Sequence, residues 1–178
     1  MKRRVQSWLE YGKNIDLMES DSAEIEKVIE ALADMPLRIE SLSKGLDKTF
    51  LHLRSEEESW SPNDILAHMR ACADVWGKSI MAMISQDHPT LRYISPRTWI
   101  RKTNYPDLDF HVSLEAFSKQ RNELLDALKP LKTSDWSRGA TFRPTTRGKK
   151  PTILSYAQRI ARHENEHYAQ LADLLKGI

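Results

Sequence analysis

The sequence has a single cysteine, no long apolar run and no large net charge, and each of these absences excludes a class of protein. Cys72 cannot form a disulfide within the chain, and such cysteine usage fits a reducing compartment. No stretch approaches the ~18 consecutive apolar residues of a membrane helix. The basic start Met1-Lys2-Arg3-Arg4 is not followed by the apolar run of a signal peptide. We therefore expect a cytoplasmic protein without a membrane partner.

The net charge, the sequence pattern and the composition limit the class of protein further. Lys plus Arg number 27 and Asp plus Glu number 25, so the net charge of +2 gives no reason to expect a nucleic-acid partner. No alternating strand pattern, internal repeat or low-complexity tract stands out. The 178 residues are 40% hydrophobic and 29% charged, which is typical of one soluble globular domain.

What the sequence does contain is four long amphipathic stretches, which predict an all-α fold. The first begins at Asp21 as an N-cap, continues through a kink at Pro36 and ends near Gly45. The others are expected over about 61–84, 113–129 and 152–176, separated by long connections. Ser61 as an N-cap, Pro62 at the first helical position and Asp64 in a capping box mark the start of the second helix. Residues 1–20 could form a short helix or a loose arm. We expect an N-terminal arm over 1–20 and a single helical domain over 21–178.

The most informative stretch lies in the last predicted helix and reads Arg162-His163-Glu164-Asn165-Glu166-His167-Tyr168. Residues four apart lie on one face of a helix, roughly 40° from each other. Two neutral imidazoles placed in this way can share one metal ion, and imidazole suits zinc, nickel, copper and iron(II).

The same stretch matches the H-E-x-x-H pattern, in which a zinc protease uses the glutamate as a general base. One large protease class places a glycine and a third histidine further along, so that the chain turns back to the metal. Here those positions hold Gln170 and Asp173, and a continuing helix would turn Asp173 away from the pair. The protease interpretation is therefore disfavoured, and a third ligand must come from upstream.

Among the upstream histidines, His68 lies within a strongly predicted helix, at the margin of its buried face. His52, His88 and His111 fall in connections or at helix boundaries. A bundle can aim His68 at the pair His163 and His167, leaving an open coordination position as in a catalytic metal site. A lone inward histidine is also common in ordinary cores, so the residues alone leave both interpretations open.

Glu164 lies near the centre of the apolar face of the last helix, where an unpaired carboxylate is costly. Two explanations are open. It could be a catalytic proton acceptor or a group that orients a metal ligand. It could equally form a salt bridge with Arg159 or with an arginine on another helix.

Two motifs resemble the DinB-like (DinB/YfiT-like) superfamily. The first is Trp60-Ser61-Pro62-Asn63-Asp64-Ile65-Leu66-Ala67-His68-Met69, and the second runs from Arg162 through His163 and His167 to Leu171. The resemblance covers about residues 21–176. It implies a four-helix bundle with a long crossover between the second and third helices, and a divalent metal ion held by His68, His163 and His167. It also implies a homodimer, since family members are often dimers.

The resemblance implies a small metalloenzyme. Characterised relatives include thiol-dependent S-transferases and a thiol-dependent isomerase, and many others are described as metal-dependent hydrolases without a demonstrated substrate. We expect a zinc, nickel or iron ion and a small-molecule substrate, such as an anionic thiol. The alternative is a non-catalytic metal-binding or stress-response module of the same fold.

Two further features could contribute to such a site. Arg97, Arg101, Lys102 and the basic loop 138–150 could hold an anionic substrate, although such segments are more often simply solvated. Cys72 is one helical turn from His68 and could lie near the metal, although a packing role is the more common one.

Overall fold

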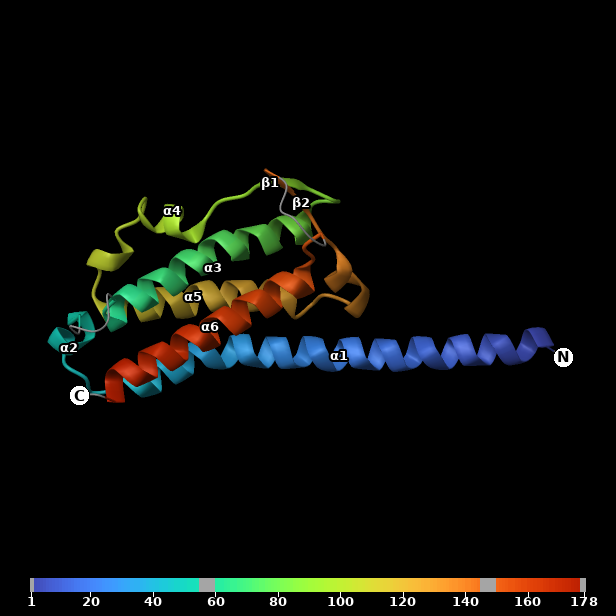
Figure 1. Cartoon of the computed structure of the whole chain (residues 1–178), viewed down its shortest axis with the longest axis horizontal. Helices are drawn as coiled ribbons and strands as arrows, with labels where there is room; N and C mark the ends of the chain where they lie inside the picture. Colours follow the sequence, from blue (N-terminus) through green and yellow to red (C-terminus); the bar gives the residue numbers. More distant parts are fainter. Residues whose placement is uncertain (1, 55–59, 145–149, 177–178) are drawn as a thin grey trace.

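The computed structural model describes the backbone of residues 2–54, 60–144 and 150–176, and the side chains of these residues from Asp21 onward. In this part of the chain, four long helices pack as a bundle (Figure 1). They are α1 (Lys2–Ser43), α3 (Pro62–Ser85), α5 (Phe110–Leu128) and α6 (Ile153–Lys176). The predicted all-α four-helix bundle is confirmed.

The first helix begins earlier than the sequence predicts. α1 starts at Lys2 and passes through Asp21 without a break, so Asp21 is not its N-cap. The N-terminal part of α1 extends beyond the bundle (Figure 1). Pro36 is accommodated inside the helix, and Gly45 follows its end with a positive φ of 77°, a conformation that glycine adopts without steric cost. The division of the chain into an arm and a domain stays a prediction.

The start of α3 is fixed by local hydrogen bonds, as predicted. The Ser61 side chain accepts a hydrogen bond from the Asp64 backbone N–H, and the Asp64 carboxylate accepts from the Ser61 N–H. Pro62 occupies the first turn, where its missing N–H costs nothing. Arg54 donates to both carboxylate oxygens of Asp64 and so ties the preceding segment to this end. A short helix that was not predicted, α2 (Lys48–His52), precedes it.

The long crossover between α3 and α5 is anchored to the outer side of α3. It contains β1 (Thr90–Arg92), α4 (Pro96–Ile100) and the 3-10 helix η1 (Tyr105–Asp107). The Asp74 carboxylate accepts hydrogen bonds from Trp99 Nε1, the Tyr105 hydroxyl and Gln120 Nε2, at 2.7–2.8 Å. One carboxylate on α3 therefore holds both the crossover and α5. The third helix begins at Phe110 rather than Ser113, because Asp109 caps it.

The two long connections meet in a small sheet that the sequence did not reveal. β1 pairs in parallel with β2 (Thr141–Arg143), with Leu91 opposite Phe142. Three residues are too few to show an alternating pattern. The 3-10 helix η2 (Thr133–Ser137) precedes β2. At the start of α6, Thr152 and Ser155 exchange backbone-to-hydroxyl hydrogen bonds.

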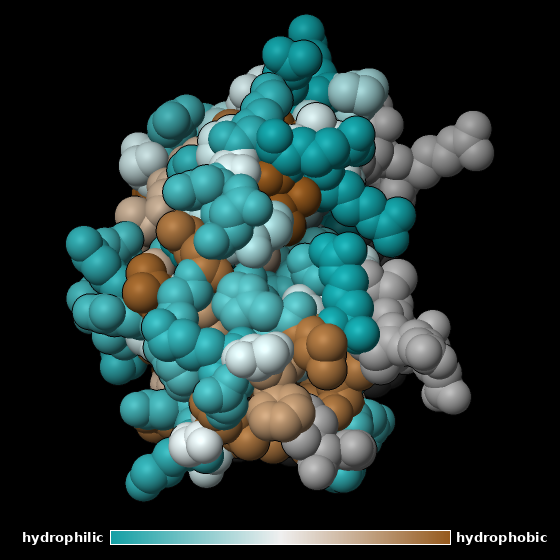
Figure 2. All heavy atoms as spheres, turned by 90° about the vertical axis from the view of Figure 1, so that its left-hand side faces the viewer, coloured by the Kyte–Doolittle hydropathy of each residue, from teal (hydrophilic) through white to brown (hydrophobic). Residues whose placement is uncertain are grey.

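The core consists of two clusters of buried side chains. One contains Cys72, Trp76 and Ile160, and the other contains Met35, Met69 and Phe117. His68 lies next to Met69 in the chain and one turn before Cys72, so it sits where the two clusters adjoin. On the end face drawn in Figure 2, hydrophobic side chains lie among hydrophilic ones rather than covering the face. No helix in the described part of the chain is long and apolar enough to cross a membrane.

Candidate metal centre

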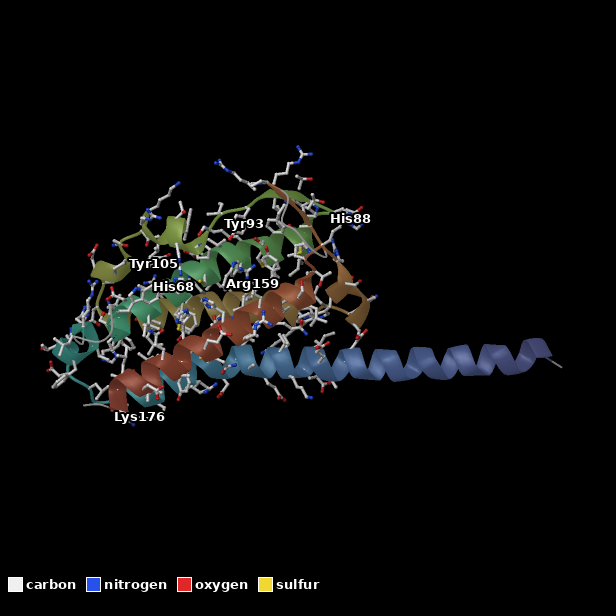
Figure 3. All side chains as sticks on the ribbon, in the orientation of Figure 1. His68, His88, Tyr93, Tyr105, Arg159 and Lys176 are labelled. Atoms are coloured by element: carbon white, nitrogen blue, oxygen red, sulfur yellow. The ribbon has the colours of Figure 1, made fainter. Side chains whose placement is uncertain are left out.

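Packing of α3 against α6 brings three histidines together. The Nε2 atom of His163 lies 3.3 Å from that of His68 and 3.2 Å from that of His167. All three side chains offer a ligand nitrogen within 4.8 Å of the others. His68 points from α3 into the space between the two helices (Figure 3). The sequence predicted this set, and the fold places its members side by side.

The surroundings of the cluster fix the orientation of its rings. His167 Nδ1 lies 3.2 Å from Gln170 Oε1, one turn further along α6. When that nitrogen donates its proton to the amide oxygen, Nε2 is left with the free electron pair that a metal requires. The Trp60 ring stacks on the His167 ring and contacts the His68 ring at a tilt. The Trp76 and His163 rings pack edge to face, with their centroids 4.8 Å apart. The sequence pattern predicts no role in the site for these neighbours, because none of them is an expected metal ligand.

Burial keeps the three imidazoles in their neutral form. Burial, followed by the charges of His167 and Arg97, lowers the pKa of His68 to about 4. Burial and the neighbouring imidazoles lower the pKa of His163 to about 3. Burial also lowers the pKa of His167. At neutral pH each ring is therefore uncharged and able to donate an electron pair.

The donor set fits a divalent metal ion. Two nitrogens that each lie 2.0–2.1 Å from one tetrahedral zinc are roughly 3.3 Å apart, close to the spacing seen here. Neutral imidazoles that direct their Nε2 atoms at one point gain little from each other without a cation. His163 Nδ1 is buried and has no hydrogen-bond partner among the described residues, so this ring lacks the orienting bond that His167 has. That His68, His163 and His167 bind a metal stays a prediction.

Cys72 lies directly beside the cluster. Its Sγ is 3.5 Å from His68 Nε2 and 4.0 Å from His163 Nε2. The side chain is buried, and burial raises the pKa of the thiol to about 12. Without a cation, this cysteine is therefore a protonated thiol.

Glu164 forms a buried ion pair with Arg121 on α5. Arg121 is 2% exposed and Glu164 is fully buried, so each charge depends on the other. Burial raises the pKa of Glu164, and the Arg121 guanidinium opposes that shift. A salt bridge to another helix was one of the two explanations left open by the sequence, and this pair supports it. The role of Glu164 as a proton acceptor stays a prediction.

Two arginines flank the cluster from different elements. The Arg159 guanidinium on α6 lies over the Trp76 ring at 4.6 Å, and Trp76 contacts His163. Arg97 on α4 is close enough for its charge to lower the pKa of His68. Within the described residues, neither arginine forms an ion pair with a carboxylate. Both therefore keep a positive charge available to an incoming anion.

The other predicted contributors are not part of this cluster. His52, His88 and His111 are exposed. The Arg101 side chain donates to the backbone carbonyl of Arg97. Residues 145–149 of the basic loop 138–150, which include Arg147 and Lys149, lie outside the described residues.

Comparison with known proteins agrees with this architecture. Residues 31–171 match the family model of the DinB superfamily. The fold is similar to that of YfiT from Bacillus subtilis, with a TM-score of 0.72 over 84% of this chain and 85% of that chain, at 15% sequence identity. YfiT is described as a probable metal-dependent hydrolase with an unusual four-helix bundle topology. None of the curated proteins matches the chain in sequence.

Proposed function

This chain belongs to the DinB superfamily, and on that premise we propose that it is a small metalloenzyme. Its divalent ion is held by His68, His163 and His167, and its substrate is a small anionic molecule. The observation that carries the proposal is the proximity of three histidines from two helices, with the Nε2 atom of His163 3.3 Å from that of His68 and 3.2 Å from that of His167. The description of YfiT as a probable metal-dependent hydrolase supports the same class of chemistry.

The exposure of the cluster favours a catalytic site over a closed structural one. His163 and His167 are half-buried, so the ion remains accessible from one side. An ion with three protein ligands supplies Lewis-acid chemistry at neutral pH, lowering the pKa of a bound water or a bound thiol. The reaction is then either hydrolysis or transfer of a low-molecular-weight thiol to an electrophile.

The residues around the ion have separable tasks in this proposal. Gln170 holds His167 in the tautomer that presents Nε2. Trp60 and Trp76 form apolar walls that exclude water from the histidines and strengthen electrostatic interactions there. Arg97 and Arg159 orient the negative group of the substrate. The Arg121–Glu164 pair ties α6 to α5 next to His163.

Turnover distinguishes this proposal from a non-catalytic module. Protein loaded with zinc, cobalt, nickel or iron(II) is assayed for hydrolysis of activated esters and amides, and for conjugation of small thiols to an aryl halide. We expect at least one reaction to stop on chelation and in the His163→Ala/His167→Ala variant. Equal rates with and without metal across both panels, in a protein that still binds the ion, would favour the non-catalytic metal-binding or stress-response module.

A further inference from the structure

A pocket of about 240 Å³ lies between α3 and the crossover, apart from the three histidines. Figure 1 shows the crossover running along α3, and residues of α3, β1, α4 and the segment between β1 and α4 line the pocket. Its first lining residue on α3, Val75, lies about two helical turns beyond His68. None of the proposed metal ligands is in this lining. The pocket is therefore a second candidate binding site, distinct from the candidate metal centre.

The walls of this pocket are apolar and are held in place by hydrogen bonds. Val75, Leu91, Ile94 and Trp99 supply the apolar surface. Trp99 Nε1 donates to the Asp74 carboxylate on α3 at 2.8 Å, which fixes the orientation of the indole ring. Leu91 lies in the middle of β1, which pairs with β2. Because both sides are tied down, the pocket is formed before a ligand binds, as is usual for small-molecule sites.

Two positive charges lie at the rim of the pocket. Lys78 on α3 and Arg92 on β1 both line it, and both are exposed. The Lys78 ammonium lies 4.5 Å from the centroid of the Trp99 ring, so a cation–π contact holds it beside the apolar wall. Among the described residues, no carboxylate lines the pocket and neither cation forms an ion pair. An apolar pocket with two free cations at its rim complements an anion that has an apolar body.

We propose that this pocket binds a small carboxylic acid whose apolar body is a phenyl ring with a short chain, or an alkyl group of similar size. A cavity of ~150 Å³ holds benzene, so a pocket of about 240 Å³ also has room for a short chain. The apolar body packs against Trp99 and Leu91. The carboxylate lies at the rim, where Arg92 offers a planar pair of donors and Lys78 a point charge. This inference goes beyond the proposed function and does not depend on a metal ion.

Isothermal titration calorimetry with 3-phenylpropionate tests the site, and 3-phenyl-1-propanol is the matched neutral ligand. We expect the carboxylate to bind about five-fold more tightly than the alcohol, since an exposed ion pair contributes modestly to affinity. Absence of binding by the carboxylate, or equal affinities for the two ligands, would overturn the inference.

The titration uses EDTA-treated protein, so that the carboxylate has no metal ion to bind. We expect the His163→Ala/His167→Ala variant to have wild-type affinity for 3-phenylpropionate. Binding that requires added zinc, or that is lost in this variant, would place the ligand at the histidines and contradict a separate site. Failure of the carboxylate to bind leaves the proposed metal function untouched, because the two sites share no residue.

Substitutions at the rim and the wall locate the bound ligand. Lys78→Gln and Arg92→Gln should each weaken binding of 3-phenylpropionate about five-fold and leave binding of the alcohol unchanged. Lys119→Gln, which removes an exposed charge from α5, is the matched control. Ser79 also lines the pocket, and Ser79→Phe should fill it and abolish binding of both ligands. Equal affinities of the two rim variants and the control would show that the carboxylate does not lie at this rim.

Nuclear magnetic resonance of the wild type gives a readout that does not depend on the folding of Ser79→Phe. Trp99 is one of five tryptophans, and its indole N–H signal is identified by its absence from Trp99→Phe. We expect this signal to shift more than the other four as 3-phenylpropionate is added. A larger shift at Trp60 or Trp76, which contact the histidines, would assign the ligand to the candidate metal centre and overturn the inference.

Discussion

The Nε2 atoms of His68 and His163 lie 3.3 Å apart, although 95 residues separate them in the sequence. This proximity depends on the packing of α3 against α6 and is lost when the bundle unfolds. An ion bound between the two helices therefore stabilises the folded state by its own binding free energy. We therefore predict that binding of a divalent ion by His68, His163 and His167 raises the free energy of unfolding.

His68→Ala should weaken metal binding strongly, because it removes the ligand contributed by α3. We expect zinc affinity, measured by competition with a chelating dye, to fall by at least about 100-fold. His52→Ala and His88→Ala remove exposed imidazoles and serve as controls that retain wild-type affinity. Normal binding by His68→Ala would show that the third ligand has been misassigned.

The Arg121–Glu164 pair should behave as a unit in stability measurements. Removing one partner in Arg121→Met or Glu164→Leu leaves the other group buried without its partner, which should lower the free energy of unfolding by about 3–5 kcal/mol. The double variant Arg121→Met/Glu164→Leu leaves no buried charge and should recover most of that loss. Urea unfolding of the singles and the double measures the coupling. Additive losses would contradict a tightly coupled pair.

The metal-free protein should lose stability below neutral pH. In the unfolded chain a histidine protonates near pH 6.5, whereas in the folded protein burial lowers the pKa of His68 to about 4 and that of His163 to about 3. Between about pH 4 and 6.5 the unfolded state binds more protons, so the free energy of unfolding rises with pH and levels off above 6.5.

Urea unfolding in the presence of EDTA at pH 5.0, 6.0 and 7.5 checks this dependence. The expected slope is positive over this range and shallower in His68→Ala, which lacks one of the responsible groups. The same slope in both proteins would assign the pH dependence to other residues.

Arg159 should confer a preference for anions near the metal. Mercaptoacetate and 2-mercaptoethanol are matched small thiols that differ in charge, and their binding is followed by the spectrum of the cobalt-loaded protein. We expect mercaptoacetate to bind more tightly, and Arg159→Gln to reduce its affinity about five-fold, the effect of ~1 kcal/mol from an exposed charge. Arg159→Lys should retain much of the preference. Arg101→Gln is the control, because the Arg101 side chain donates to the backbone carbonyl of Arg97. Equal affinities of the wild type for both thiols would contradict the proposal that the substrate is anionic.

The sequence predicted those parts of the structure that depend on local pattern. The capping arrangement at Ser61, Pro62 and Asp64 located the start of α3, and apolar spacing located the long helices. The spacing of His163 and His167 predicted a shared face on α6. Each of these features involves residues within one or two helical turns of each other, and local sequence patterns predict structure over this range.

What the sequence did not specify depends on contacts between distant segments. The partner of Glu164 is Arg121 on another helix, and nothing in the spacing distinguishes it from other arginines. The pairing of β1 with β2 joins two connections by three residues each, too few for a pattern. The extension of α1 to Lys2 was missed because Asp21, which was expected to cap the helix, is also compatible with a helix interior.

The central claim is that His68, His163 and His167 bind one divalent ion, and metal analysis of protein purified without an affinity tag tests it most directly. Elemental analysis by mass spectrometry should find about one ion of zinc, nickel or iron per chain in the wild type. The His163→Ala/His167→Ala variant, expressed and purified in parallel, should retain less than half of that amount. Wild-type protein without bound metal that also takes up none on dialysis, or a double variant with a full complement, would contradict the account.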